Sequence, residues 1–222
     1  MMKILPLVRE IYPASKFGIL TVRGLDAGFD RSCMQTLKRD ELEKIKVLHS
    51  GYERKLIIDK EPMCRYTAYY KQFKKTYHVL LQLESVLLKD RGIPDTDIPV
   101  EVMFLAEMKN LLLTAVHDLD KIDGSLTMCA AAGTESYVNI SGKTELLTKD
   151  DLYLSDESGV ISDILCGPDY RTRISGATKN ALYFVYGVDG ITEAQIRSHL
   201  EDIRSYISAA AKSAQFDPIE IY

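Results

Sequence analysis

The sequence predicts an α+β fold in which a mainly antiparallel sheet system has helices packed on it. Between residues 117 and 187, short apolar runs alternate with turn residues, which is a pattern of strands rather than of helices. Before this segment, apolar residues recur at helical spacing over most of residues 37–116, and they do so again at residues 192–211. The chain is therefore expected to place helices before and after a body of strands.

The N-terminal half is predicted to hold one strand followed by helices. Residues 17–24 (FGILTVRG) have the β-branched and aromatic content of a strand. Pro62 is expected to start a later helix, and Arg91 with Gly92 follow another in the order of a C-terminal cap. The predicted helical tracts are residues 37–57, 64–73, 79–89 and 100–116.

The C-terminal half begins at a charged turn, HDLDKIDG, and continues as strands. After the strands, Thr192 and Gln195 have the spacing of a capping box at the start of a helix. That helix is expected to bury one apolar face, which consists of Ile196, Leu200, Ile203 and Ile207.

Length and composition suit one globular unit with an N-terminal attachment. The chain has 222 residues, of which 46% are hydrophobic, enough for a substantial core. Residues 1–75 are predicted to form a strand and helical attachment, and residues 76–222 the main body, together as one compact unit. Residues 38–91 carry 13 Lys and Arg against 8 Asp and Glu, on a chain whose net charge is −4. This basic arm is either a nucleic-acid contact or an ordinary solvated helix surface.

Several classes of site and location are disfavoured. The start, MMKILPLVRE, has too short an apolar run for a secretory signal, and no segment approaches the roughly 20 apolar residues of a membrane span. We therefore expect a cytoplasmic chain without membrane contact. The four cysteines have no C-x-x-C spacing, so free thiols and no metal site are predicted. No cofactor is expected, because the Gly142-Lys143-Thr144 triplet has Tyr137 where a phosphate-binding loop needs glycine.

Three stretches, taken in order, carry a family resemblance. They are the apolar helix that leads into HDLDKIDGSLTM, the strand-turn-strand segment KDDLYLSDESGVISDIL, and RTRISGATKNALYFVYG. From about residue 76 onward the chain resembles the B-three/B-four editing domain of the phenylalanyl-tRNA synthetase beta chain, above all the stand-alone proteins built from it. The resemblance implies a sheet sandwich with helices packed on it and a pocket for the 3′ end of mischarged tRNA.

Two positions depart from the family's editing residues. Where the family has a histidine ahead of the aspartate turn, this chain has Ala115. The position of the family's glutamate falls at about Phe184. A site without a dedicated nucleophile is still chemically admissible, because an aminoacyl ester needs mainly an oriented water and donors to a developing oxyanion. Thr178 and Asn180 are the candidate catalytic residues on this basis.

The other candidates come from turns that the resemblance brings together. His117, Asp118, Tyr170 and Arg171 are expected to bind substrate, with Arg171 suited to a phosphate or carboxylate. Lys71, Lys74 and Lys75 are the candidate nucleic-acid contacts. Each of these side chains has an ordinary structural alternative, such as closing a turn or forming a surface ion pair.

Two functions remain open on these residues. The first is recognition of aminoacyl-tRNA through its 3′ end, with hydrolysis of mischarged tRNA in trans. The second is a non-catalytic module that binds an amino acid, a small carboxylate or an RNA end. A pocket between the ILCGPDY loop (residues 164–170) and the HDLD turn (residues 117–120), and the polarity of its lining, would discriminate between them.

Overall fold

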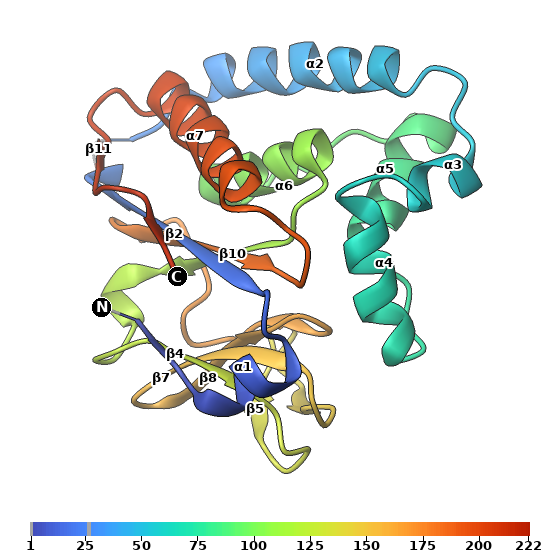
Figure 1. The fold of residues 1–222 in the computed structure, drawn as a ribbon. Helices are drawn as coiled ribbons and strands as arrows, with labels where there is room; N and C mark the ends of the chain where they lie inside the picture. Colours follow the sequence, from blue (N-terminus) through green and yellow to red (C-terminus); the bar gives the residue numbers. More distant parts are fainter. Residues whose placement is uncertain (1, 26–27) are drawn as a thin grey trace.

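A computed structural model describes residues 2–25 and 28–222 and has three layers (Figure 1). A layer of helices lies over one five-stranded sheet, and a second five-stranded sheet lies on the other side of the first. The chain is thus a mixed α+β fold, as predicted. The finer expectation, a sandwich of the editing-domain type, stays a prediction.

The sheet next to the helices has the order β11-β2-β10-β3, with β12 also paired to β2. The long strand β10 pairs antiparallel with both β2 and β3, and it is buried along its whole length. Its neighbour β2 confirms the strand expected near residues 17–24. The strands are β2 (Lys16–Arg23), β3 (Thr114–Asp118), β10 (Ala181–Gly187), β11 (Gln215–Phe216) and β12 (Glu220–Ile221).

The second sheet has the order β1-β4-β7-β8-β9, and a separate hairpin, β5-β6, lies beside it. All of its pairings are antiparallel except the short one between β1 and β4. Its strands are β1 (Lys3–Ile4), β4 (Thr127–Ala130), β7 (Leu152–Asp156), β8 (Gly159–Asp163) and β9 (Gly167–Pro168). The hairpin consists of β5 (Ser136–Val138) and β6 (Thr144–Leu146).

The helices occupy most of residues 31–110 and a segment near the C-terminus. Thr192 and Gln195 form the predicted capping box of α7, whose buried face includes the expected isoleucines and leucine. A short 3₁₀ turn, η2 (Leu119–Lys121), follows β3. The helices are α1 (Pro6–Ile11), α2 (Arg31–Leu48), α3 (Arg54–Ile58), α4 (Met63–Gln72), α5 (His78–Lys89), α6 (Ile98–Asn110) and α7 (Glu193–Ala210).

The structure corrects two of the predicted helical tracts. The tract at residues 37–57 is two helices, because α2 ends at Leu48 and Gly51 then takes a left-handed backbone (φ 74°) that a helix cannot continue through. The tract at residues 100–116 ends as a helix at Asn110, where Leu111 is left-handed (φ 58°), and β3 begins at Thr114. Apolar spacing concealed this change because both α6 and β3 are buried on almost every side.

The N-terminal strands take part in both sheets. β1 extends the second sheet beside β4, and β2 lies between β10 and the C-terminal strands of the first. One large apolar cluster connects residues from nearly every element, including Phe17, Leu105 and Ile203. In the described residues, no helix is long and apolar enough to cross a membrane.

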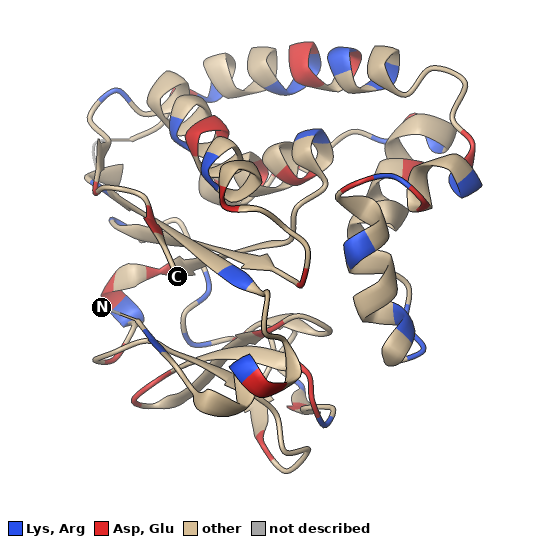
Figure 2. Cartoon of the chain, in the orientation of Figure 1, with Lys and Arg blue, Asp and Glu red and all other residues tan. Residues whose placement is uncertain are grey.

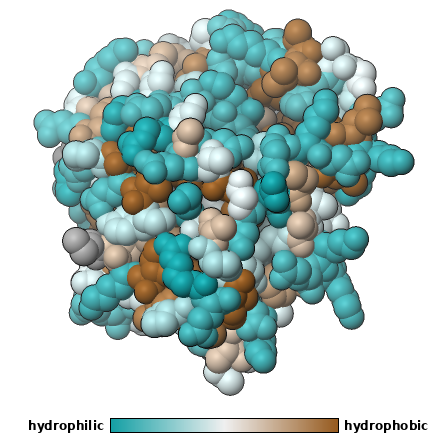
Figure 3. Space-filling view, in the orientation of Figure 1, coloured by the Kyte–Doolittle hydropathy of each residue, from teal (hydrophilic) through white to brown (hydrophobic). Residues whose placement is uncertain are grey.

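The outer end of the helical layer is less well covered. Val47, Leu48 and Leu56, near the junction of α2 and α3, are exposed. In Figure 3 brown apolar surface interrupts the mostly polar face at that end of α2. Isolated apolar side chains of this kind are ordinary on soluble proteins.

Candidate functional site

The two candidate catalytic residues are both hydrogen-bonded to aspartates of the HDLD turn. The Thr178 hydroxyl donates to Oδ2 of Asp118 at 2.8 Å and accepts the Ser175 backbone N–H. The Asn180 amide donates to both carboxylate oxygens of Asp120, at 2.8 and 3.0 Å. These bonds hold the threonine-asparagine element against the turn, so that both side chains are already engaged.

His117 lies in β3 and is completely buried. Its Nδ1 is 2.7 Å from the Thr172 hydroxyl, and its Nε2 is 3.1 Å from the Ser162 hydroxyl. Burial, reinforced by the positive charge of Arg171, lowers the pKa of His117 to about 3. A neutral imidazole with both ring nitrogens satisfied links the two sheets and has no free face for a substrate.

Arg171 and Tyr170 lie on the outside of the same region. One guanidinium nitrogen of Arg171 donates to both oxygens of Asp156, at 2.8 and 2.9 Å, and another donates to the Lys121 carbonyl. The Tyr170 ring is exposed, and the guanidinium of Arg173 lies over it, 3.5 Å from the ring centre. The structure thus brings the sequence-predicted polar residues into one region, where Thr178 bonds to Asp118 while Asn180, His117 and Arg171 bond to other neighbours.

A cavity of about 420 Å³ lies beside this network, where residues 163–168, β3, α5 and α6 meet. It adjoins the ILCGPDY loop, as expected, but its other wall is Leu113–Val116 rather than the HDLD turn itself. Among the described residues, none of the six predicted catalytic and substrate-binding side chains lines it. Its volume is in the range of small-molecule pockets, roughly 300–1,000 Å³.

Both positions of the family's missing editing residues are close to this cavity. Ala115 lines the cavity, and Phe184 is its register partner on β10. Phe184 is fully buried between Phe17, at 6.0 Å between ring centres, and Tyr186, at 4.7 Å. Ala115 thus makes this part of the wall apolar, whereas Phe184 lies behind it and outside the lining.

One face of α6 supplies much of the lining. Val100, Met103, Phe104 and Glu107 recur at the spacing of a single helical face, and all four line the cavity. The remaining wall is also largely apolar and includes Ile140, Ile164, Leu165, Pro168 and Ile174. Glu107 is therefore a carboxyl group in an otherwise hydrophobic surrounding.

Glu107 is buried to 1% exposure, and burial raises its pKa to about 8. Oε1 accepts the Thr114 backbone N–H at 2.8 Å, whereas Oε2 has no hydrogen-bond partner among the described residues. His78, which also lines the cavity, has its pKa lowered to about 4 by burial and contacts the Tyr70 hydroxyl through Nδ1. At neutral pH the cavity wall thus holds a neutral imidazole and a mostly protonated carboxyl.

The predicted nucleic-acid contacts lie next to this cavity. Lys71, Lys74 and Lys75 are exposed at the end of α4 and in the loop after it, where the ribbon is blue in Figure 2. The Lys75 ammonium is 3.6 Å from the sulfur of Cys166, a cavity-lining residue. One lysine of the three, Lys75, therefore borders the cavity.

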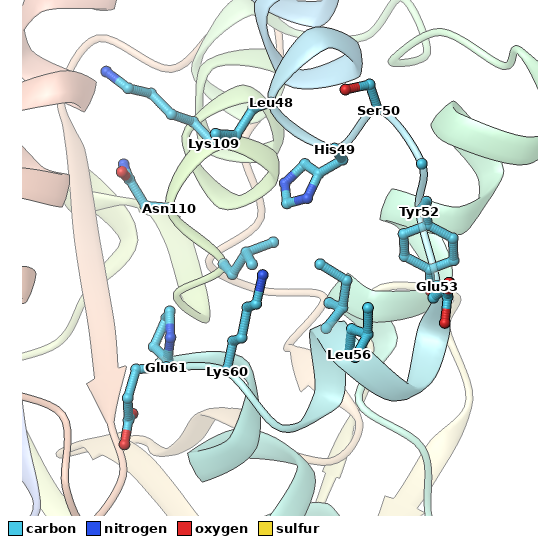
Figure 4. Close-up of a pocket in the computed structure, with 14 residues that line it drawn as sticks. Leu48, His49, Ser50, Tyr52, Glu53, Leu56, Lys60, Glu61, Lys109 and Asn110 are labelled. Atoms are coloured by element: carbon cyan, nitrogen blue, oxygen red, sulfur yellow. The ribbon is translucent and has the colours of Figure 1, made fainter.

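A second cavity, about 360 Å³, lies at the ends of α2 and α6 beside α3. Figure 4 shows Lys60 and His49 pointing into it. Burial and the charge of Lys60 lower the pKa of His49. None of the candidate site residues predicted from the sequence lines this second cavity. In residues 2–25 and 28–222, no group of three His, Cys, Asp or Glu side chains is arranged to hold a metal ion.

Sequence reasoning missed Glu107, Gln82 and Asp163 as cavity residues. For Glu107 a signal was present, because it is four residues after Met103 and thus in phase with the apolar positions of the tract at residues 100–116. A charge at a core position is usually paired or functional. No comparable signal marks Gln82 or Asp163.

Comparisons with known proteins agree with the predicted resemblance at the level of the fold. No model of a known protein family matches the chain, and no curated protein matches it. Among solved structures, it is similar to an N-terminal fragment of the phenylalanyl-tRNA synthetase beta subunit from Pyrococcus horikoshii, with a TM-score of 0.51 and 12% sequence identity. The likeness covers 97% of this chain and 50% of that one, so this chain spans about half the length of the solved structure. Identity this low shows a shared fold alone.

Proposed function

We propose that this chain recognises aminoacyl-tRNA and holds the aminoacylated 3′ end in the cavity between α5, α6, β3 and residues 163–168. The observation that carries the proposal is the position of the lysine cluster at the cavity, through the contact of Lys75 with Cys166. Lysines suit an RNA backbone, and a largely apolar cavity of about 420 Å³ suits an amino-acid side chain. The likeness to a synthetase fragment agrees with this role.

The test compares the affinity of the protein for aminoacylated and deacylated forms of the same tRNA, by fluorescence anisotropy over a panel of amino acids. We expect tighter binding of at least one aminoacylated form. Val100→Trp, which fills the cavity from α6, should abolish the preference, whereas Val47→Trp on the exposed surface of α2 should preserve it. Equal affinity for every charged and uncharged pair would contradict the proposal.

Hydrolysis of mischarged tRNA in trans is the finer form of this function, with Thr178 and Asn180 as the residues expected to carry it. Their hydrogen bonds to Asp118 and Asp120 favour recognition without turnover. Single-turnover deacylation separates the two forms. Loss of an oriented water or an oxyanion donor costs roughly a hundredfold in rate, so Asn180→Ala should remove any hydrolysis that depends on it.

A non-catalytic module for an amino acid, a small carboxylate or an RNA end is the alternative function. The hydrogen bonds that already hold Thr178 and Asn180 support this alternative equally well. The alternative requires no ester chemistry. A wild-type protein that deacylates none of the aminoacyl-tRNAs in the panel, but still binds one of them, would favour this alternative.

A further inference from the structure

Some residues that line the cavity carry buried hydrogen-bonding atoms without a partner in the described part of the chain. Within the described residues, five buried side-chain polar atoms lack a hydrogen bond, and three of these belong to cavity-lining residues: Gln82, Glu107 and Asp163. A buried acceptor without a partner destabilises the folded state. Such a concentration in one cavity indicates a place where a ligand donates hydrogen bonds.

Asp163 has another explanation and does not support a ligand site. Its carboxyl interacts with that of Asp151, and burial together with Asp163 raises the pKa of Asp151 to about 8. The other oxygen of Asp163 accepts from the Tyr137 hydroxyl and the Cys166 N–H. Two atoms then remain for a ligand, Oε2 of Glu107 and Oε1 of Gln82.

Oε1 of Gln82 is an acceptor, and Oε2 of Glu107 is an acceptor once the carboxyl is ionised. The two residues lie on different helices, α5 and α6, and both line the same cavity. Most of the other lining side chains are hydrocarbon and favour an apolar ligand body. Arg173, the cationic side chain in the lining, has its guanidinium stacked on Tyr170. We infer that the cavity binds a protonated primary amine with an apolar body, whose ammonium group donates to Glu107 and Gln82.

This inference rests on the proposed function, since the α-amino group of an aminoacyl ester is such an amine. It also specifies the chemical group that the cavity recognises, a free amino group. The raised pKa of Glu107 agrees, because a cation bound beside it would stabilise the carboxylate and release a proton. The ionisable groups around Glu107 are Tyr66, Tyr70 and Tyr77, and the neutral His78 lies in the same cavity wall.

The experiment is isothermal titration of the whole protein with L-phenylalaninamide and L-leucinamide, each against its N-acetyl form. Acetylation removes the ammonium and leaves the apolar body. We expect at least one free amide to bind and its acetylated form not to bind. Titration in buffers of different ionisation enthalpy should show proton release on binding.

Matched variants locate the amine within the cavity. Glu107→Gln and Gln82→Leu should each weaken the binding of the free amide about tenfold or more, the usual effect of losing a hydrogen bond to a charged group. Glu84→Gln makes the same chemical change on α5, where Glu84 accepts from Tyr52 outside the cavity lining, and should leave the affinity unchanged. If Glu107→Gln does not fold, Gln82→Leu and the acetylated amides still test the site.

Two results would overturn the amine site. One is binding of free and acetylated amides with equal affinity. The other is no binding of either amide, which would mean that Glu107 and Gln82 satisfy each other. Failure of the proposed function looks different: the free amides bind, but no tRNA does, charged or uncharged. Conversely, N-acetyl-aminoacyl-tRNA binding as tightly as aminoacyl-tRNA would retain the tRNA role and remove the amine site.

Discussion

At the scale of single residues, the polar groups of this chain divide into two kinds. Thr178, Asn180 and His117 have their hydrogen bonds made within the protein, and they connect turns and sheets. One oxygen of Glu107 accepts a hydrogen bond, the other has no partner in the part of the chain that the structure describes, and the side chain lies in an apolar wall. The hydrogen bonds of the first kind stabilise the fold, whereas the unpaired atom of Glu107 lowers stability by an amount that a bound ligand can offset.

The raised pKa of Glu107 predicts how stability depends on pH. Its pKa is about 8 in the folded protein against an ordinary value of 4.5, so between these limits the unfolded chain loses a proton that the folded chain keeps. The contribution of protonated Glu107 to the free energy of unfolding is present in full at low pH and is lost as pH rises to about 8. Urea unfolding should therefore show wild type losing up to about 4 kcal/mol relative to Glu107→Gln over this window. Parallel pH profiles would mean that Glu107 ionises normally.

Thr178→Val should destabilise the protein by about 1–3 kcal/mol. The substitution keeps the shape but removes the hydroxyl that donates to Asp118 and accepts from Ser175, so the buried Asp118 carboxylate loses a donor and the half-buried Ser175 N–H loses its acceptor. Thermal and urea unfolding measure the loss. Thr144→Val, on an exposed position of β6, is the control and should change stability by less than about 0.5 kcal/mol.

At the scale of elements, three tyrosines determine where α4 lies. The hydroxyl of Tyr66 donates to the Tyr186 carbonyl at 2.7 Å, that of Tyr69 to Asp151 at 2.7 Å, and that of Tyr70 to the Ile164 carbonyl at 2.6 Å. These bonds attach one helix to strands and loops of both sheets. They also place the C-terminal end of α4, with its lysines, beside the cavity.

The capping box of α7 gives a second element-scale expectation. Thr192 accepts the Gln195 backbone N–H, and the Gln195 side chain accepts the Thr192 N–H in return. Thr192→Ala should lower the free energy of unfolding by about 1 kcal/mol, while Thr192→Ser, which keeps the hydroxyl, should change it little. Chemical denaturation of the two variants checks this difference. Equal losses in both would show that the hydroxyl bond does not stabilise the helix.

At the scale of the whole molecule, charge is unevenly distributed. The chain carries −4 overall, yet residues 38–91 are basic, and their lysines at the end of α4 lie beside the cavity. This segment is not a projecting arm, because α2 packs against α6 and α7. An RNA bound there would contact the body of the protein as well as the helices.

Changing Lys71, Lys74 and Lys75 together to Glu should weaken binding of all tRNAs alike, because phosphate contacts do not depend on sequence. The logarithm of the affinity should also fall less steeply with the logarithm of salt concentration, by about one unit of slope per lysine. Anisotropy titrations over a salt series measure both effects. The control triple, Lys3, Lys16 and Lys212 to Glu, makes the same charge change at other exposed positions. Equal effects of the two triple variants would mean that the lysines of α4 act only through the net charge of the protein.

The sequence by itself determined the α+β class, the strand at β2, the helix boundaries of α4 and α5 to within a residue or two, and the cap of α7. Each of these is encoded locally, in the period of apolar residues or in cap chemistry. The family resemblance also anticipated the fold likeness to the synthetase fragment.

Only the tertiary structure decided where the cavity lies and which groups face it. Glu107 and Gln82 are on different helices, and Ala115 is on a strand that apolar spacing had assigned to a helix. The hydrogen bond between Asp118 and Thr178, 60 residues apart, is likewise a product of the tertiary structure, and the catalytic role of Thr178 stays a prediction. Local spacing says which side chains are buried, whereas long-range packing decides which of them find partners and which are left for a ligand.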